Sequence, residues 1–287
     1  MKLKKRKGWA LFVTAALLVG ILTSGRTPVG KNDLVLAAEI SASAENNYGL
    51  KNPVVKAVAP PAKTSHGLSN PRNDNGTVTW DCVYFGSYWQ SDTNGDGVAD
   101  QNDEKEPIKW RVLSVDGDDA FLLADRNLDV QEYDDTEEEE VTWETCTMRS
   151  WLNGTFLNNA FNESEQEAIK VTDVVNEDNS EYGTEGGNDT QDKVYLLSLS
   201  EVMNPEYGFG SVESDNNTRK AVNTSYVAAG GEINVMMESA GNTDDWWLRS
   251  PGGISDIASL VGSCGYVYKD GNDVHAIIMS RRVPLCI

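Results

Sequence analysis

The C-terminal stretch, residues 244–287, constrains the fold more strongly than any other part of the sequence. Its apolar run at 246–248 is closed by Ser-Pro-Gly-Gly. Proline has no N–H to donate and glycine accepts a positive φ, so a strand should end there. Two further strand-like runs, 263–268 and 274–280, flank the pair Asp270-Gly271, which favours a tight hairpin turn. We therefore expect three short strands in the core sheet of a compact α+β domain.

Residues 1–38 have the features of a secretory signal peptide. A basic start, MKLKKRK, precedes an apolar run of about 14 residues, whereas a membrane span needs roughly 20. Val35 and Ala37 suit positions −3 and −1 of a cleavage site, and Gly25 is an alternative end point. An uncleaved anchor is the alternative. No cysteine closely follows the apolar run, so we expect no lipoprotein anchor.

Residues 39–76 are predicted to form a disordered linker, because they are rich in Ala, Ser, Asn and Pro and show no lasting period. The folded domain is predicted to span 77–287. Its length of about 210 residues is enough for one hydrophobic core.

The charge balance narrows the class of partner. The chain carries a net charge of −21, although its first 38 residues are basic. Such acidity would repel phosphates and argues against nucleic-acid binding. No second apolar run of membrane length follows, so we expect a secreted or cell-surface protein without a membrane span after signal cleavage.

The four cysteines leave the disulfide pattern open. Cys82, Cys146, Cys264 and Cys286 allow two disulfides in three pairings, and a secreted location favours oxidation. None belongs to a Cys-x-x-Cys pair, so a structural zinc site is not expected. The alternative is one bridge or simply buried thiols.

The domain opens with a strand followed by a hairpin. Within residues 77–90, apolar side chains alternate and predict one buried face formed by Val78, Trp80, Cys82, Tyr84 and Tyr88. Residues 107–125 predict a hairpin with its turn at Asp116-Gly117 and a buried face of Ile108, Trp110, Val112 and Ser114. The polar run between the two elements is therefore an insertion between strands.

That insertion, residues 92–103, has the ligand spacing of a calcium loop. The twelve-residue loop places oxygen ligands at positions 1, 3, 5, 7, 9 and 12 and glycine at position 6. These positions correspond to Asp92, Asn94, Asp96, the carbonyl of Val98, Asp100 and Asp103, with Gly97 at the turn. We expect one structural calcium ion there, as in dockerins and thrombospondin-type repeats, because strands rather than two helices flank the loop. The alternative is an acidic, glycine-rich turn without an ion.

Several helices are predicted after the hairpin. One spans 144–153 and stops at Gly154. Capping-box pairs predict two further helix starts: Asn162 with Glu165 or Ser164 with Glu167 for the first, and Ser198 with Glu201 for the second. Strands are expected at 170–175 and just before Ser198, and a helix is expected from Thr218 to the glycines at 230–231.

The order and spacing of several motifs resemble one family. They are YFGSYWQ, EPIKWRVL, AFLLAD, VTWETCTMRSWLN, DKVYLLSLSEV, WWLRSPG and the closing RRVPLCI. Together they resemble the domain-of-unknown-function family 6273 over about residues 77–287, although the usual Gly-Val-Arg-Pro close is here Ser280 to Pro284. The resemblance implies a C-type-lectin-like fold, similar to formylglycine-generating enzymes, with a short twisted antiparallel sheet and flanking helices. It also implies a secreted or surface protein of Gram-positive bacteria, and no particular activity.

Few residues point to catalysis. His66 lies in the linker and His275 in an expected strand, so no Ser-His-Asp set or histidine metal cluster can be assembled. Formylglycine-generating enzymes need two closely spaced cysteines, whereas Cys264 and Cys286 lie far apart in sequence. A hydrolase with an unrecognised carboxylate pair stays an alternative, because acidic residues are plentiful.

A binding role therefore fits the sequence best. The aromatic residues could supply a contact surface, but the pattern places Trp80, Trp110, Trp143, Trp151 and Trp247 in the core. Arg249 is expected to tie loops together structurally. We expect a non-catalytic binding module for an extracellular protein or glycan, with a structural or cell-surface display domain as a further alternative.

Overall fold

The computed structural model describes residues 35–36, 67–136, 138, 140–230 and 243–275. Strands outnumber helices in it, and the strands form several small sheets, which confirms the α+β class. The strands are β1 (Val35–Leu36), β2 (Arg72–Asp74), β3 (Thr77–Thr79), β4 (Cys82–Tyr88), β5 (Glu106–Asp116), β6 (Asp119–Ala124), β7 (Arg126–Asn127), β8 (Thr172–Val174), β9 (Thr190–Asp192), β10 (Ala221–Asn223), β11 (Thr243–Asp244), β12 (Trp246–Pro251), β13 (Ile257–Val261) and β14 (Val267–Asp273). The helices are α1 (Thr147–Trp151), the π-helical η1 (Leu152–Phe156), α2 (Leu157–Ala160), α3 (Glu163–Ala168), α4 (Leu199–Val202), the 3-10 helix η2 (Pro205–Tyr207) and α5 (Ser225–Gly230).

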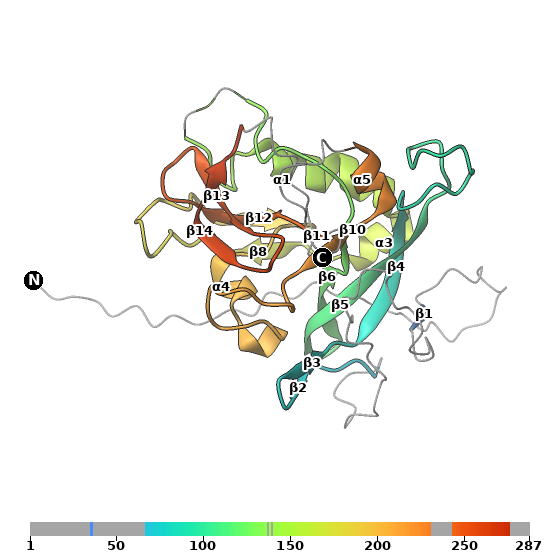
Figure 1. Cartoon of the computed structure of the whole chain (residues 1–287), viewed down its shortest axis with the longest axis horizontal. Coiled ribbons are helices and arrows are strands. Elements are labelled where there is room, and N and C mark those ends of the chain that lie inside the picture. The colour runs from blue at the N-terminus through green and yellow to red at the C-terminus, as the bar shows by residue number, and fades with distance from the viewer. Residues whose placement is uncertain (1–34, 37–66, 137, 139, 231–242, 276–287) are drawn as a thin grey trace, which may run out of the picture.

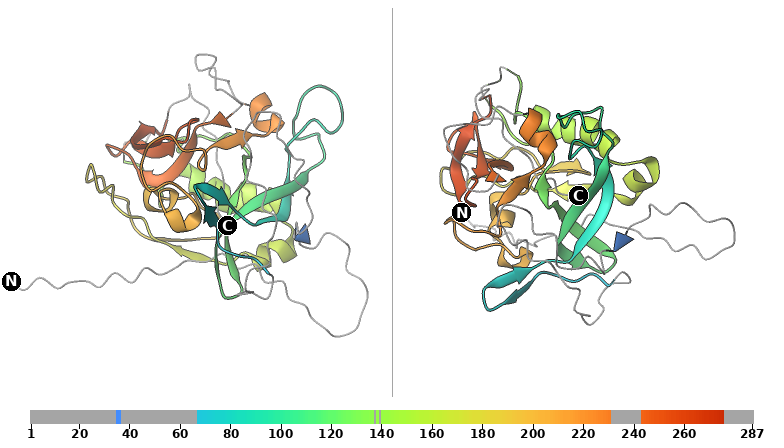
Figure 2. Two further views of the ribbon diagram at one scale, coloured as in Figure 1. Left: turned by 60° about the horizontal axis from the view of Figure 1, so that its bottom comes forward. Right: turned by 45° about the vertical axis from the view of Figure 1, so that its right-hand side comes forward.

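The largest sheet has the order β1-β4-β5-β6, and its neighbouring strands are antiparallel. The predicted hairpin is present, because Asp116 pairs with Asp119 across the turn. Its predicted buried face is largely confirmed: Ile108, Trp110 and Val112 are fully buried. Opposite this sheet, across the molecule, lies the sheet β12-β13-β14 (Figures 1 and 2).

The predicted buried face of the first strand is partly wrong. Val83 and Phe85 are buried, whereas Cys82 and Tyr84 are half-buried. The alternation breaks at Asp81, which is not part of a strand, and shifts again between Tyr84 and Ser87, where the pairing with β5 is irregular. The strand therefore changes the face it buries within a few residues.

The sequence predicts that the domain starts at Thr77, but residues before Thr77 also belong to it. β2 pairs antiparallel with β3, with Arg72 opposite Thr79. The Ser69 backbone N–H and hydroxyl both donate to the Asp81 carboxylate, at 2.9 and 2.7 Å. Residues 67–76 thus pack onto the domain. The rest of the predicted linker, and most of the predicted signal peptide, lie outside the described residues.

The predicted C-terminal strands are partly wrong: residues 263–266 of the predicted strand 263–268 lie in the turn between β13 and β14, and β13 itself was not predicted. β12 continues through Pro251, and Asp270-Gly271 lies inside β14 rather than in a turn. A Cβ at Gly271 would lie 2.2 Å from the Ala258 carbonyl oxygen, so this glycine permits close strand approach instead. The turn between β13 and β14 is closed by Gly262, whose N–H donates to the Tyr266 oxygen at 2.8 Å. The predicted strand at 274–280 lies mostly outside the described residues.

Two helix predictions are wrong in extent. Gly154 does not end a helix: α1 continues through η1 into α2, because Leu152, Phe156 and Ala160 all face the core. Residues 221–223 form β10 rather than helix, and α5 begins only at Ser225. β10 pairs in parallel with β7 and antiparallel with β11, a non-local pairing that overrides local helix preference. The capping boxes of Asn162 with Glu165 and of Ser198 with Glu201 are confirmed, whereas the alternative start at Ser164 is wrong because Ser164 lies inside α3.

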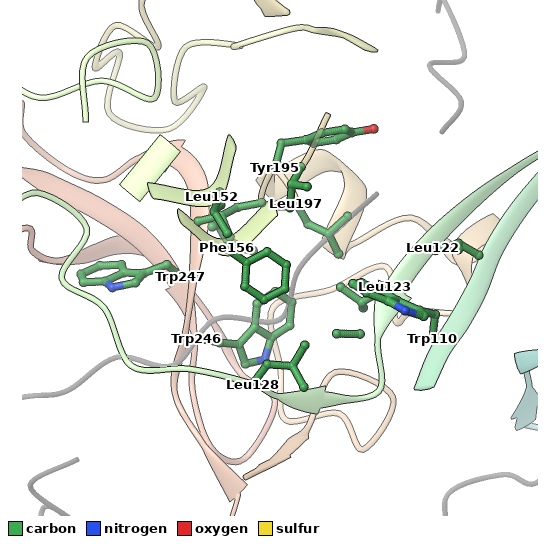
Figure 3. Packing of buried hydrophobic residues seen from close by; sticks show 14 of the residues in the cluster. Trp110, Leu122, Leu123, Leu128, Leu152, Phe156, Tyr195, Leu197, Trp246 and Trp247 are labelled. Carbon is green, nitrogen blue, oxygen red and sulfur yellow. The ribbon is translucent and has the colours of Figure 1, made fainter. Parts of the chain in front are cut away.

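The core joins the two sheets through aromatic side chains (Figure 3). Trp110 comes from the β5–β6 hairpin, Trp246 and Trp247 come from β12, and Phe156 lies between these groups. Of the tryptophans that the sequence places in the core, Trp80, Trp110, Trp143 and Trp247 are buried and Trp151 is partly buried. The tryptophan part of the core prediction is thus confirmed.

The cysteines of the described part of the chain are free thiols. Cys146 is buried, and Cys82 and Cys264 are half-buried. Burial raises the pKa of Cys146 to about 12 and that of Cys82 to about 11, which keeps both protonated at neutral pH. The pattern of two disulfides is therefore not formed, while Cys286 lies outside the described residues.

Candidate functional site

The predicted calcium loop projects from the end of the β4–β5 hairpin (Figure 2). Gly95 and Gly97 have φ angles of 78° and 97°, which a residue with a Cβ rarely adopts. These two glycines turn the backbone so that the acidic side chains point back at the N–H groups of the loop.

Asp103 closes the loop. Its Oδ1 accepts from the Thr93 and Asn94 N–H groups at 2.7 and 3.0 Å, and its Oδ2 accepts from the Asp100 N–H at 2.8 Å. The Asp100 backbone bond is the main cause that lowers the pKa of Asp103, with burial acting in the opposite direction. The residue at position 12 is thus a buried, ionised carboxylate.

The first half of the loop is a series of side-chain to backbone hydrogen bonds. Asp92 accepts from Gly95 N–H at 2.7 Å and from Gly97 N–H at 2.8 Å. Asn94 accepts from the Asp96 N–H, and Asp96 accepts from the Val98 N–H, at 2.8 and 2.9 Å. These bonds fix the orientations of the side chains at positions 1, 3 and 5 relative to the loop backbone.

The remaining two predicted ligand positions lie at the exposed side of the same loop. Asp100 accepts from the Asn102 N–H at 2.7 Å, and the Val98 side chain is exposed. In the part of the chain that the structure describes, no three His, Cys, Asp or Glu side chains are arranged to hold a metal ion. The loop thus directs its carboxylates to its own N–H groups: Asp103 Oδ1 accepts three hydrogen bonds and Asp92 Oδ1 accepts two, so a bound ion would have to displace some of these bonds.

A second candidate site is a surface that the sequence did not reveal. We call it the β14 surface and define it by four exposed apolar side chains: Tyr182, Val212, Ile254 and Tyr268. Tyr268 lies on β14 itself. Each of the other three is next in sequence to a residue that contacts β14. Glu181, beside Tyr182, forms an ion pair with Lys269 of β14. The Glu213 oxygen, beside Val212, accepts from the Val267 N–H, and the Gly253 N–H, beside Ile254, donates to the Asp270 oxygen. Four separate segments thus meet around one strand.

Asn179 fixes the segment that carries Tyr182. Its buried amide group donates to the carbonyl oxygens of Pro251 and Lys269, both at 2.9 Å. Its Oδ1 accepts from the Glu181 N–H at 3.1 Å. The segment is therefore tied to both β12 and β14.

Arg219 fixes the segment that carries Val212. Its guanidinium is 1 % exposed and donates to four carbonyl oxygens, those of Gly210, Val212, Ser214 and Gly265, at 2.5 to 2.8 Å. The segment is thereby joined to the turn between β13 and β14. Neither Asn179 nor Arg219 stands in a local motif, so sequence patterns gave no signal for them.

Arg249 has the structural role that the sequence predicts. It is buried, forms an ion pair with Glu201, and donates to the Leu196 oxygen at 2.7 Å and the Val175 oxygen at 3.2 Å. His275 lies in a turn after β14, within 2.9 Å of the Glu138 carbonyl oxygen, while His66 lies outside the described residues.

Asp129 is half-buried, and the loss of solvent raises the pKa of its carboxyl group. The Tyr88 hydroxyl donates to Asp129, and the ring of Tyr88 packs against Trp89 with centroids 5.0 Å apart. Glycoside hydrolysis uses two carboxyl groups, whereas this pair consists of a carboxyl and a phenol. The geometry is that of a partly buried structural contact.

Taken together, these features define an α+β domain with a projecting acidic loop and an apolar surface around its C-terminal sheet. The chain belongs to the family described as "Domain of unknown function (DUF6273)", whose model matches residues 117–286. The predicted calcium loop precedes the matched part. Neither the curated proteins nor the solved structures contain a match to this chain. Among the described residues, no helix is long and apolar enough to cross a membrane.

Proposed function

We propose that this protein is a secreted, non-catalytic binding module with a C-type-lectin-like fold, which contacts an extracellular protein or glycan. The observation that carries the proposal is the β14 surface. Four exposed apolar side chains, two of them tyrosines, lie there on β14 and on three segments that are bound to it. Large apolar patches on soluble proteins commonly mark interaction sites, and tyrosine is enriched among the residues that dominate binding energy.

The anchoring of this surface supports a binding role. Asn179 and Arg219 hold two of its segments against the C-terminal sheet through buried hydrogen bonds. A surface that is already ordered loses less conformational entropy when a partner binds. This anchoring therefore favours recognition over a passive spacer.

We further propose that the loop at 92–103 binds one structural calcium ion. The donor set suits a hard cation, because Asp92, Asn94, Asp96, Asp100 and Asp103 offer only oxygen atoms and Val98 adds a carbonyl. Hydrogen bonds from the loop's own N–H groups already order these side chains. A calcium ion would neutralise the carboxylates and stabilise the end of the β4–β5 hairpin.

Replacing both tyrosines of the β14 surface is expected to weaken partner binding at least tenfold. Full-length protein is screened in calcium against purified extracellular proteins and glycans, and each hit is measured again with the Tyr182→Ser/Tyr268→Ser variant. Val171→Ser is the matched control, because Val171 is equally an exposed apolar side chain, in a segment apart from β14. Equal loss in the control, or none in the double variant, would remove the β14 surface from the proposal.

The alternatives make different predictions in the same screen. A hydrolase would convert a glycan hit into shorter products, and that activity would survive the loss of the two tyrosines. A display domain would give no hit at all. Neither alternative is favoured by a specific observation, since the Tyr88–Asp129 pair lacks a second carboxyl group.

A further inference from the structure

A cleft of about 900 Å³ opens between the β4–β5 hairpin and the corner where α2 meets α3. The strands contribute Tyr84, Ser87 and Gln90, and the helical side contributes Asn158, Asn159 and Asn162. The cleft belongs to the β4–β6 side of the molecule, opposite the β14 surface (Figure 1). Its size is within the usual range of small-molecule sites, about 300–1,000 Å³.

The floor of the cleft is rigid because the helical corner lies directly on β4. Gly86 has a φ of 66°, and a Cβ there would lie 2.5 Å from the Phe161 ring and 2.7 Å from the Ala160 oxygen. The rings of Phe85 and Phe161 pack with centroids 5.2 Å apart. Only glycine at position 86 therefore lets the α2–α3 corner approach β4 this closely.

The charged groups of the cleft are already satisfied by the protein. Lys105 donates to the Asn159 carbonyl oxygen at 2.7 Å and lies 4.3 Å from the centre of the Trp89 ring. The Glu165 carboxylate accepts from the Asn162 and Gly86 N–H groups, at 2.9 and 3.3 Å. Glu106 accepts from the Ser91 hydroxyl at 2.7 Å. Two carboxylates against one ammonium give the cleft a net negative charge, which disfavours an anionic ligand.

Two of the neutral amides are held by the protein, because Gln90 Nε2 donates to the Glu106 and Pro107 oxygens and Asn162 Oδ1 accepts from the Glu165 N–H. The neutral side chains left for a ligand are those of Asn159, Ser87 and Tyr84. Amide side chains can donate and accept at once, as can the hydroxyl groups of Ser87 and Tyr84. Sugar hydroxyls have the same dual character, and the C–H face of a sugar ring packs against an aromatic ring such as that of Tyr84. From this combination we propose that the cleft binds a neutral oligosaccharide, at a site distinct from the β14 surface.

An extended peptide fits the cleft less well. A peptide that adds to a sheet edge needs free N–H and C=O groups on that edge. The edge of β4 is already paired with β1 at Val83 and Tyr84, the Gly86 N–H donates to Glu165, and the α2–α3 corner covers this part of the strand. The cleft therefore offers a ligand side-chain polar groups rather than free main-chain N–H and C=O groups.

The test uses uncharged di- and trisaccharides of glucose, galactose, mannose, N-acetylglucosamine and N-acetylgalactosamine. Binding to the full-length protein is measured by saturation-transfer NMR and calorimetry at sugar concentrations up to about 5 mM, enough to detect millimolar affinity. Tyr84→Ala and Asn159→Ala are the site variants. Asn217→Ala is the matched control, because Asn217 is an exposed amide distant in sequence from the cleft residues. A thermal melt of each variant establishes that it is folded.

We expect at least one neutral sugar to bind, with affinity reduced tenfold or more in each site variant and unchanged in the control. Absence of binding by every sugar would overturn the proposal, as would unchanged affinity in both folded site variants. Stronger binding of sialylated or sulfated sugars would also overturn it. Loss only in Tyr182→Ser/Tyr268→Ser would move sugar binding to the β14 surface, which refutes the cleft site and leaves the binding module intact.

Discussion

Replacement of Asp125 by alanine is expected to lower the free energy of unfolding by about 3–5 kcal/mol, the usual effect of breaking a buried ion pair on one side. Asp125 is buried and accepts from Arg111 at 2.6 Å and from Lys109 at 3.2 Å. Arg111 is itself buried and lies 5.0 Å from the centre of the Trp80 ring. Without Asp125, both cations lose their counter-charge inside the domain.

Urea unfolding of the full-length protein at neutral pH measures this effect. Glu167→Ala serves as the control, because Glu167 is an exposed carboxylate on α3 and should change stability by less than about 0.5 kcal/mol. A loss below about 1 kcal/mol in Asp125→Ala would mean that water reaches the cluster and that its charges are not buried together.

The same carboxylate should give a pH dependence of known sign. Burial by itself raises the pKa of Asp125, but Arg111 and Lys109 outweigh burial and lower the pKa to about 2. Because this folded-state pKa lies below the unfolded value of about 3.9, the contribution is complete above roughly pH 4–5 and is lost as the pH falls towards 2. Wild-type protein should lose about 2 kcal/mol more than Asp125→Asn between pH 6 and pH 2. Equal losses would contradict the lowered pKa.

Replacement of Arg219 by methionine is expected to destabilise the protein by about 3 kcal/mol or more. The guanidinium donates to four carbonyl oxygens, three in the 210–214 segment and the fourth at Gly265. Hydrogen bonds that involve a charged group contribute roughly 1.5–3 kcal/mol each, and such contributions are not additive. The loss should therefore exceed that of one bond and fall short of the sum.

Arg219→Lys separates charge from geometry. Lysine keeps the positive charge but lacks the planar fork that reaches several carbonyls at once, so we expect a smaller loss, about 2 kcal/mol. Hydrogen exchange should also rise at the Val267 N–H, which donates to the Glu213 oxygen in the same segment. If Arg219→Lys were as stable as the wild type, the four hydrogen bonds from the Arg219 guanidinium would not be what anchors this segment.

Local patterns predicted the features that depend on neighbours in sequence. The β5–β6 hairpin follows from alternation and its Asp-Gly turn, and the two capping boxes follow from a spacing of three residues. The role of Arg249 followed from its place in a dense apolar run. Each of these signals lies within a short window, where pattern and structure coincide.

Long-range packing accounts for the predictions that were wrong. β10 is a strand because β7 and β11 lie on either side of it, and Gly154 stays helical because residues on both sides are buried. The pair Asp270-Gly271 predicted a turn, but Ala258 approaches that glycine from another strand. The β14 surface could not be predicted, because its four side chains come from segments that meet only in the folded chain.

A thermal melt of the full-length protein, with calcium and with chelator, most directly tests the calcium-stabilised binding module. At calcium a hundred times its dissociation constant, linkage predicts about 2.7 kcal/mol of added stability. Asp96→Asn should lose most of this gain, since asparagine keeps the acceptor for the Val98 N–H but removes a charge; Glu167→Gln, outside the loop, should keep it. A calcium-dependent rise in melting temperature in the wild type and in Glu167→Gln, and a much smaller rise in Asp96→Asn, is the predicted result. The same melting temperature with calcium and with chelator would contradict it and leave the loop as an acidic turn.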